Sequence, residues 1–463
     1  MIPARFRSNV AAGAAAKEPG ERRMLGGYYV RLAMTSMRHK PVLVAMMVLA
    51  LAFGVAMSMS AFTILHTMAR DPIPEKSSQL YAVQIDNGGP RSRKPGDNEP
   101  PAQVTWRDAS AWLSMHRATR EAAMLQVGLT LKADGEAGKG THVAGRATSA
   151  PFFTMFDVPL RYGRGWTDAE EGDRARVAVI SSALNDRVFG GENSVGRTLL
   201  LNGDAWRVIG VAGPWDPRPR FFDVAGGQAF DEGEDVYLPL QTAVSLEMET
   251  MGYEYCDAGP RGDTYADLLA SECVWLQYWA ELPSTADARH YAEGLTTYAE
   301  GQRAAGRFGW PANIRLSNVR DWLVARKVVS DDARLSVIVA FGFLAICIVC
   351  ALALMLARSL ERSGEYSLRR ALGASRRTVF LQAATEAGLI GSAAGVLGIA
   401  FTLGALGLMR DLFPGDLARI AVIDGPLLAG TVALAAASAV LAGIYPAWLA
   451  MRTAPGIQLK GGL

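Results

Sequence analysis

The sequence is poor in charge, cysteine and histidine. Only 20% of its 463 residues are Asp, Glu, Lys or Arg, which is low for a soluble protein of this length. The net charge of +2 gives no reason to expect a nucleic-acid partner. Four cysteines are too few for a disulfide scaffold. We expect no metal site, because ligand spacing is absent among the five histidines, which are His39, His66, His116, His142 and His290.

The chain also lacks a phosphate-binding loop. The segment from Gly135 to Thr141 resembles one superficially, but Gly140 follows Lys139 where Ser or Thr is required. Ala133 stands where the first glycine of such a loop belongs. We interpret the segment as a surface turn. No catalytic residues can be assigned, so we predict that the chain is not itself an enzyme and carries no cofactor.

Long apolar stretches are what the sequence has in abundance. Half of the residues are apolar and the mean hydropathy is +0.12. Runs of about 23 residues or more can cross a hydrocarbon core of about 30 Å as helices. The first run is too long for a signal peptide, so we expect it to be retained. The predicted membrane helices span residues 41–65, 335–357, 378–409 and 425–451.

Basic residues orient these helices. Six of residues 358–377 are Arg, and arginine-rich loops lie on the cytoplasmic side of membranes. Both termini are then cytoplasmic, and residues 410–424 form a short external loop. We predict a disordered tail over 1–27, with Met24 as an alternative start, and a second tail over 452–463. Between the first tail and the membrane, residues 28–40 carry apolar residues at three- and four-residue steps and basic residues on the other face. This pattern is typical of an amphipathic helix at the membrane interface.

Residues 66–334 contain no spanning run and are predicted to be one external α/β or α+β domain with two lobes, the middle lobe at roughly 141–285. Short strands are expected at 177–180 and 274–282. Asn202-Gly203 predicts a hairpin over 198–211. A helix should follow the 274–282 strand and begin at a cap formed by Ser284 or Thr285. Its buried face is expected to carry four residues, Tyr291, Leu295, Tyr298 and Ala299. Turn-rich loops are expected at 88–101 and 212–230.

The arginine-rich loop resembles a family signature. Residues 364–377 are similar to the R-E-I-G-I-L-R-A-L-G-A-S loop of MacB/FtsX-type (type VII) ABC transporter permeases, although Tyr366 and Ser367 replace the usual Ile-Gly. Residues 446–459 are similar to that family's terminal P-A-x-x-A…P-x-x-x-L signature. Further short similarities occur at residues 72–75, 80–83, 152–153, 163–164, 189–190, 195–197 and 208–211.

The resemblance implies a permease in a Gram-negative inner membrane, with its large domain in the periplasm. Its partners would be a cytoplasmic ABC ATPase dimer, which carries ATP and Mg²⁺, and a second permease copy or paralogue. The loop would couple ATPase motion to the membrane through Glu365, Arg369, Arg370, Ala371, Leu372, Gly373, Ala374 and Ser375. Alternatively, its arginines only set topology and bind anionic membrane lipid.

Three uses are compatible with this resemblance. The leading one is tripartite export of a small hydrophobic or peptide substrate, with a periplasmic adaptor and an outer-membrane channel. The second is mechanotransmission, in which the permease regulates a periplasmic cell-wall hydrolase or signalling partner. The third is extraction of lipoproteins from the membrane. The sequence does not choose among them.

Individual side chains suggest further sites. Cys256 and Cys273 lie in the external domain, where an oxidising compartment favours a disulfide, with two free thiols as the alternative. Cys347 and Cys350 lie in an apolar run and are interpreted as packing residues. Glu386 is a membrane carboxylate, expected near the inner interface and paired with an arginine.

Small and aromatic residues suggest contact surfaces. Glycines in the third apolar run allow close helix approach, either within the chain or in a dimer, and they are Gly388, Gly391, Gly395 and Gly398. Trp215, Phe221 and Phe222 lie in a proline-rich loop. They could form a contact patch for a periplasmic partner or fold back onto the domain.

Overall fold

A computed structural model describes residues 40–88, 99–132, 140–225, 229–257, 259–362, 375–412 and 425–452, together with residues 31, 34, 35, 37, 38, 364, 365 and 367. The chain divides into two compact units. Met1–His66 and Asp331–Leu463 form the first, which we call the helix bundle. Thr67–Ser330 form the second, which we call the α/β domain.

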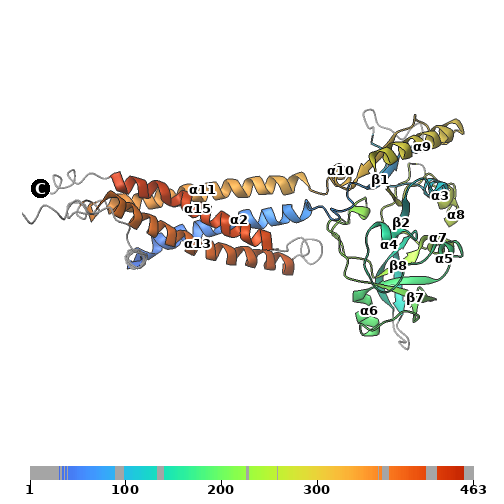
Figure 1. Cartoon of the computed structure of the whole chain (residues 1–463), viewed down its shortest axis with the longest axis horizontal. Coiled ribbons are helices and arrows are strands. Elements are labelled where there is room, and N and C mark those ends of the chain that lie inside the picture. The colour runs from blue at the N-terminus through green and yellow to red at the C-terminus, as the bar shows by residue number, and fades with distance from the viewer. Residues whose placement is uncertain are drawn as a thin grey trace, which may run out of the picture. The chain divides into compact units, whose positions relative to one another are not determined.

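Four long helices run together in the bundle (Figure 1). Each is long and apolar enough to cross a membrane, which confirms the predicted number of spans. They are α2 (Pro41–Met68), α11 (Asp331–Glu361), α13 (Arg376–Leu412) and α15 (Gly425–Arg452). Helix α11 extends beyond the predicted 335–357 at both ends. Asp331 and Asp332 lie in its first turn and Arg358 in its last, where each charge complements the helix dipole.

The predicted interfacial helix at 28–40 is described only in part. Arg31, Met34, Thr35, Met37 and Arg38 are helical. The predicted tail at 1–27, the tail predicted at 452–463 except for Arg452, which ends α15, and most of the loop at 410–424 lie outside the described residues.

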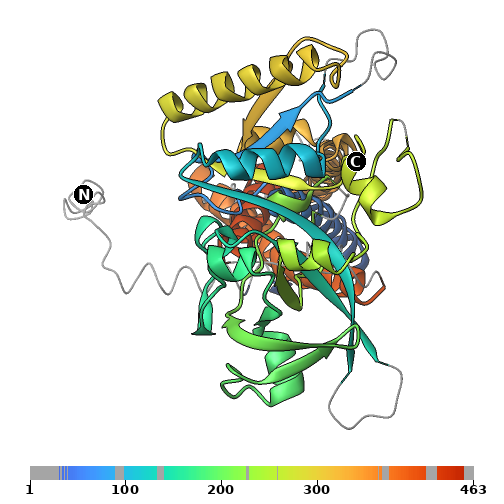
Figure 2. The same ribbon diagram turned by 90° about the vertical axis from the view of Figure 1, so that its right-hand side faces the viewer.

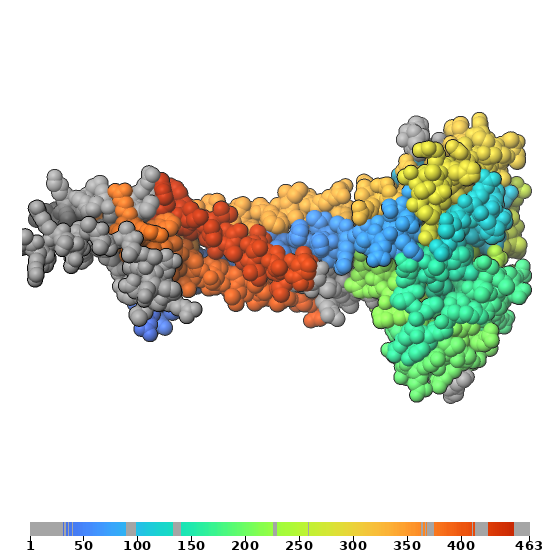
Figure 3. Space-filling view, in the orientation of Figure 1, coloured from blue at the N-terminus to red at the C-terminus, as the bar shows by residue number. Residues whose placement is uncertain are grey.

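Helices α13 and α15 approach closely because small residues face each other. A Cβ added at Gly391 would lie 1.9 Å from the Ala439 Cβ, and one added at Gly443 would lie 2.4 Å from the Ala387 Cβ. Figure 3 shows the two helices in direct contact along their length. The facing pairs recur every four residues in antiparallel register, so small side chains form a continuous seam between the helices.

The predicted packing glycines therefore differ in their surroundings. Gly391 and Gly395 face α15, and Gly398 faces Val55 of α2, so these three pack within the chain rather than in a dimer. Gly388 is exposed, with nothing within 4 Å of an added Cβ. Of the four, only Gly388 remains open to a second copy.

Replacing Gly391 by leucine should loosen the bundle, because the new side chain must displace α15. Overpacking of this kind typically costs about 1–3 kcal/mol or more. Gly404→Leu is the matched control, since Gly404 lies on the same helix with open space around it. Heating the detergent-solubilised proteins and measuring the monodisperse fraction should show a lower melting temperature for Gly391→Leu alone. Equal melting temperatures would contradict the close seam.

One mixed sheet of ten strands forms the centre of the α/β domain. Its order is β10-β1-β9-β2-β3-β8-β5-β7-β4, with β6 pairing β2 and β7. The sheet crosses the predicted lobe boundaries without a break, because β2 pairs with both β3 and β9. The strands are β1 (Leu80–Ile85), β2 (Arg120–Lys132), β3 (Thr141–Thr148), β4 (Leu160–Gly163), β5 (Val177–Ser181), β6 (Thr198–Leu201), β7 (Asp204–Ala212), β8 (Val236–Pro239), β9 (Gln277–Glu281) and β10 (Ile314–Asn318).

Local signals account for the hairpin and the long helix. Asn202 and Gly203 take positive φ values of 52° and 89° between β6 and β7, as a tight hairpin turn requires. Ser284 caps α9 (Thr285–Ala304) through a reciprocal capping box with Asp287, which decides between the two predicted caps. The shorter helices are α3 (Trp106–Met115), α4 (Phe152–Met155), α5 (Asp168–Gly172), α6 (Ser182–Phe189), η1 (Phe221–Asp223), α7 (Leu240–Ser245), α8 (Tyr265–Ala270) and α10 (Val319–Ala325).

Strand β9, which lies within the strand predicted over 274–282, is buried on both faces. Tyr278 packs edge-on against Trp112 of α3, at 5.1 Å between ring centroids. The next residue, Trp279, points to the opposite face and meets Phe221 of η1 at 5.2 Å. Figure 2 shows α3 and α9 as neighbouring helices over the sheet. Helices therefore cover one face of β9 and an aromatic cluster covers the other.

Candidate functional site

A charge cluster lies near the ends of α11 and α13 that the arginine-rich loop connects. Arg358 Nη2 lies 2.7 Å from Glu386 Oε1, and Arg362 Nη1 donates to Glu386 Oε2 at 3.2 Å. Arg358 and Glu386 are only 6% and 8% exposed. A carboxylate buried in a bundle is stable only when it is paired, so two guanidinium groups hold Glu386 and join α11 to α13.

Further ion pairs extend this cluster. Arg362 Nη2 lies 3.4 Å from Glu365 Oε2. Lys40, just before α2, pairs with Glu361 in the last turn of α11. Three of the four bundle helices are thus linked by charge where the loop of residues 358–377 begins and ends.

The predicted coupling residues fall partly outside this description. Glu365 is half-buried and belongs to the cluster. Ser375 accepts a hydrogen bond from Thr378 N at 3.2 Å, so it caps the start of α13. The remaining predicted coupling residues lie outside the described residues, and they are Arg369, Arg370, Ala371, Leu372, Gly373 and Ala374.

Removing Arg358 should destabilise the bundle, because Glu386 would lose its shorter ion pair while staying buried. Breaking a buried pair costs about 3–5 kcal/mol. We expect Arg358→Met to melt well below the wild type in detergent. Arg334→Met, at an exposed arginine 3.8 Å from Asp331 on the same helix, should melt like the wild type. The double variant Arg358→Met/Glu386→Met should recover stability, and a further loss would disprove the pairing.

The α/β domain contains a second, fully buried charge network. Arg146 of β3 is 0% exposed. Its Nε donates to Glu234 Oε1 at 2.5 Å, and its Nη2 pairs with Asp223 of η1. Arg220 also pairs with Glu234, and Gln277 of β9 donates to Asp223 Oδ1 at 2.8 Å. This network ties the loop of residues 213–235 to two central strands.

Burial and pairing act in opposite directions on this network. Burial alone would raise the pKa of Glu234, but the charges of Arg146 and Arg220 outweigh it and lower that pKa to about 2. The carboxylates hold the pKa of Arg146 above its ordinary value despite burial. Glu234 and Arg146 are therefore both charged at neutral pH.

The aromatic residues predicted as a partner patch belong to this core. Phe221 and Phe222 are 0% and 1% exposed. Arg146 Cζ lies 4.9 Å from the Phe222 ring centroid, and Trp215 stacks on the same ring at 5.4 Å. Of the two alternatives, the structure shows the second for the phenylalanines, because the loop folds back onto the domain and buries them. Only Trp215 is half-exposed.

The four cysteines separate into two kinds. Cys256 and Cys273 form a disulfide with an S–S distance of 2.00 Å. Glu254 lies beside them, but sulfurs joined to each other offer no thiolate to a metal. Cys347 is buried and Cys350 is exposed in α11, and both are free thiols.

Arg146→Met should destabilise the α/β domain by about 3–5 kcal/mol, because Asp223 and Glu234 would be left buried without their shared partner. Arg176→Met is the control, since Arg176 makes a half-exposed pair with Asp204. Denaturant unfolding of the full chain, followed by tryptophan fluorescence, reports mainly this domain, because every tryptophan except Trp448 lies within it.

The same measurement has an expected pH dependence. Because the folded-state pKa of Glu234 lies below its ordinary 4.5, its pairing stabilises the domain fully above that pH. The contribution should disappear as the pH falls from about 4.5 to about 2. Arg146→Met should flatten this part of the wild-type profile, and parallel profiles would contradict the assignment.

The architecture defines a membrane protein in which an α/β domain is inserted between the first and second spans. A profile of the MacB-like periplasmic core domain matches residues 44–297, and one of the FtsX-like permease C-terminal region matches residues 337–455. The first match covers more than half of the chain. The protein belongs to this family and is a MacB/FtsX-type ABC transporter permease of the inner membrane, with its α/β domain in the periplasm.

Named relatives are distant. The chain is 23% identical over 323 residues to the uncharacterized ABC transporter permease YvrN of Bacillus subtilis, covering 67% of this chain and 68% of YvrN. It is 24% identical over 441 residues to the macrolide export ATP-binding/permease protein MacB of Chlorobium luteolum, covering 93% of this chain and 60% of MacB. The match to MacB of Syntrophobacter fumaroxidans covers 46% of that relative, so the chain spans about half of its length.

Among solved structures, the periplasmic region of MacB from Actinobacillus actinomycetemcomitans is similar at 13% identity and a TM-score of 0.35. The match covers 56% of this chain and 96% of that region.

Proposed function

We propose that the chain relays the motion of a cytoplasmic ATPase to its periplasmic domain and thereby drives export. The observation that carries this proposal is the ion-paired cluster around Glu386. It ties α11 and α13 together at the two ends of one cytoplasmic loop. A loop fixed at both ends can move two helices as one body, whereas a free tail cannot.

The α/β domain is built to receive such a movement at one place. The chain enters it just before β1 and leaves it just after β10 and α10. These two strands pair antiparallel over five residues, from Tyr81↔Asn318 to Ile85↔Ile314. Arg320 of α10 also pairs with Asp71 of the entering segment at 2.7 Å. Entry and exit are therefore one mechanical unit at the edge of the sheet.

ATP binding and hydrolysis belong to a separate ATPase in this proposal, and a second permease completes the complex. Export of a small hydrophobic or peptide substrate through a periplasmic adaptor and outer-membrane channel is the use we favour. It is supported by the names of relatives, which include macrolide export and pyoverdine export proteins.

Site-specific photo-crosslinking tests the coupling. A photoreactive residue placed at Glu365 or Ser375 in the native membrane should capture an ABC ATPase, identified by mass spectrometry. The same residue at Asp411, toward the other end of α13, is the control and should capture none. Gly373→Trp should abolish capture while leaving membrane insertion intact, because a bulky side chain would block close approach.

The opposite results are equally clear. Capture of lipid alone at Glu365 and Ser375 would assign the loop to topology and membrane binding. Full ATP turnover and transport by a Gly373→Trp complex would likewise refute coupling through this loop.

A further inference from the structure

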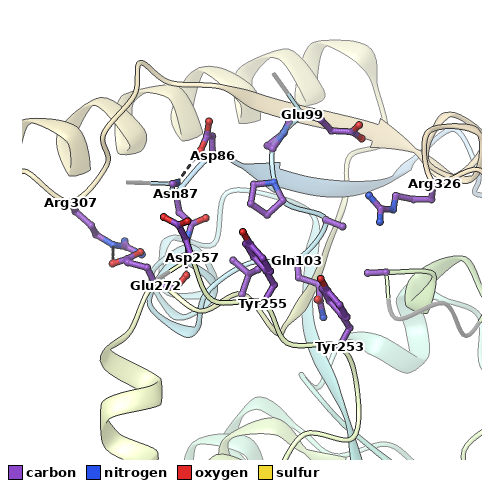
Figure 4. Close-up of a pocket in the computed structure, with 16 residues that line it drawn as sticks. Asp86, Asn87, Glu99, Gln103, Tyr253, Tyr255, Asp257, Glu272, Arg307 and Arg326 are labelled. Carbon is purple, nitrogen blue, oxygen red and sulfur yellow. Dashed lines mark hydrogen bonds and ion pairs between the residues drawn. The ribbon is translucent and has the colours of Figure 1, made fainter. Parts of the chain in front are cut away.

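A pocket of about 480 Å³ opens in the α/β domain beside the end of β1. Its size is that of a small-molecule site. Figure 4 shows side chains from separate segments converging on it. Those that carry the argument are Gln103, Tyr253, Tyr255, Asp257 and Arg326. The coupling role of the chain does not use any of them.

One wall is held in place by buried amides. Gln84 of β1 is 0% exposed, and its Nε2 donates to the carbonyl oxygens of Pro100 and Pro101 at 3.0 and 3.2 Å. Asn87 Nδ2 donates to the Glu272 carbonyl at 3.0 Å. The prolines add stiffness because their φ angles are fixed. This part of the pocket is therefore formed before any ligand arrives.

The disulfide holds the opposite wall. Tyr255 and Val274 exchange two backbone hydrogen bonds, at 3.0 and 2.9 Å, immediately next to the Cys256–Cys273 bridge. Tyr253 and Tyr255 are nevertheless about half exposed, at 52% and 49%. Exposed aromatic rings on a segment that is held in place offer apolar contact at little entropic cost.

One end of the pocket is acidic. Arg307 is fully engaged there, because it makes two bonds to Asp108, at 2.7 and 2.9 Å, and two to Glu272, at 2.7 and 2.9 Å. Asp257 therefore supplies the negative charge that Arg307 does not neutralise. Asp257 is exposed and makes no ion pair with any residue that the structure describes.

The other end presents hydrogen-bond donors. Gln103 is only 2% exposed, yet no described atom accepts a hydrogen bond from its Nε2. Arg326 Nε is also buried without an acceptor among the described residues. In Figure 4, Arg326 and Asp257 lie on opposite sides of the two tyrosines. A buried donor without a partner is costly, so an acceptor supplied by a ligand would be stabilising.

We propose that this pocket binds a small peptide with a free amino terminus. The protonated amine would lie at Asp257, and the side chain of the first residue would pack on Tyr253 and Tyr255. A carbonyl or carboxylate oxygen would accept from Gln103 and Arg326. The site goes beyond the proposed coupling function, because binding requires neither the ATPase nor transport.

Calorimetric titration of the full chain in nanodiscs tests the site with phenylalanyl-alanine as the probe. The wild type should bind this dipeptide, and N-acetylation of the probe should weaken binding about tenfold or more, since it removes the charge. Asp257→Asn should weaken binding of the free dipeptide by a similar factor and leave binding of the acetylated one unchanged. Gln103→Leu should weaken both.

Asp263→Asn is the matched control, because Asp263 is an exposed carboxylate on the same connecting segment outside the pocket. Tryptophan-fluorescence melting of each variant separates lost binding from lost folding. The proposal is overturned if the dipeptide gives no saturable heat at millimolar concentration. It is also overturned if the acetylated dipeptide binds equally well, or if folded Asp257→Asn binds like the wild type. None of these outcomes bears on ATPase coupling, which crosslinking tests separately.

Discussion

A carboxylate among apolar helices must be neutralised, and Glu386 meets that requirement by binding two arginines. Its position forces α11 and α13 together near the arginine-rich loop, because separating them would expose an unpaired charge to apolar surroundings. The small-residue seam between α13 and α15 then fixes the next helix. Charge thus selects which helices meet at the loop, and close packing holds them in register.

The α/β domain also neutralises a buried charge, but there the central ion is a cation and its partners are carboxylates. There Arg146 is the buried ion, and carboxylates from η1 and from the segment before β8 come to it. Such a network contributes specificity more than net stability, since an apolar core of equal volume would also be stable. The arrangement that brings Asp223 and Glu234 to Arg146 also buries Phe221 and Phe222.

Sequence reasoning predicts features whose signals are local. The four spans follow from run length, the 202–203 turn from Asn-Gly, and the α9 start from two adjacent capping candidates, Ser284 and Thr285, of which the structure uses Ser284. The family resemblance, carried by short motifs in order, is confirmed by the matches over 44–297 and 337–455. Each of these signals lies within a single stretch of chain.

Features that depend on distant pairs could not be predicted. Arg146 is separated from Asp223 by 77 residues and from Glu234 by 88, so nothing near Arg146 reveals its partners. The same limit explains why the sequence left open whether Phe221 and Phe222 form a partner patch or fold back onto the domain. Glu386 was recognisable as a site, because an acid in an apolar run is itself unusual. Arg358 lies in the preceding helix and Arg362 just after its end, and neither was identifiable individually as the partner.

The position of the disulfide connects stability with binding. Cys256 and Cys273 are separated by 17 residues, and the bridge closes a segment that contributes just one short helix, α8, and makes few strand contacts. A loop of that length would gain about 3 kcal/mol from closure in the chain-entropy account. A sheet of ten strands does not need that contribution in order to fold. The pocket wall that carries Tyr253, Tyr255 and Asp257 does need the stabilisation from the disulfide, because this wall joins the sheet in this region through one isolated bridge. The bridge therefore serves to order a surface, and ordering a surface before binding is what lowers the entropic cost of holding a ligand.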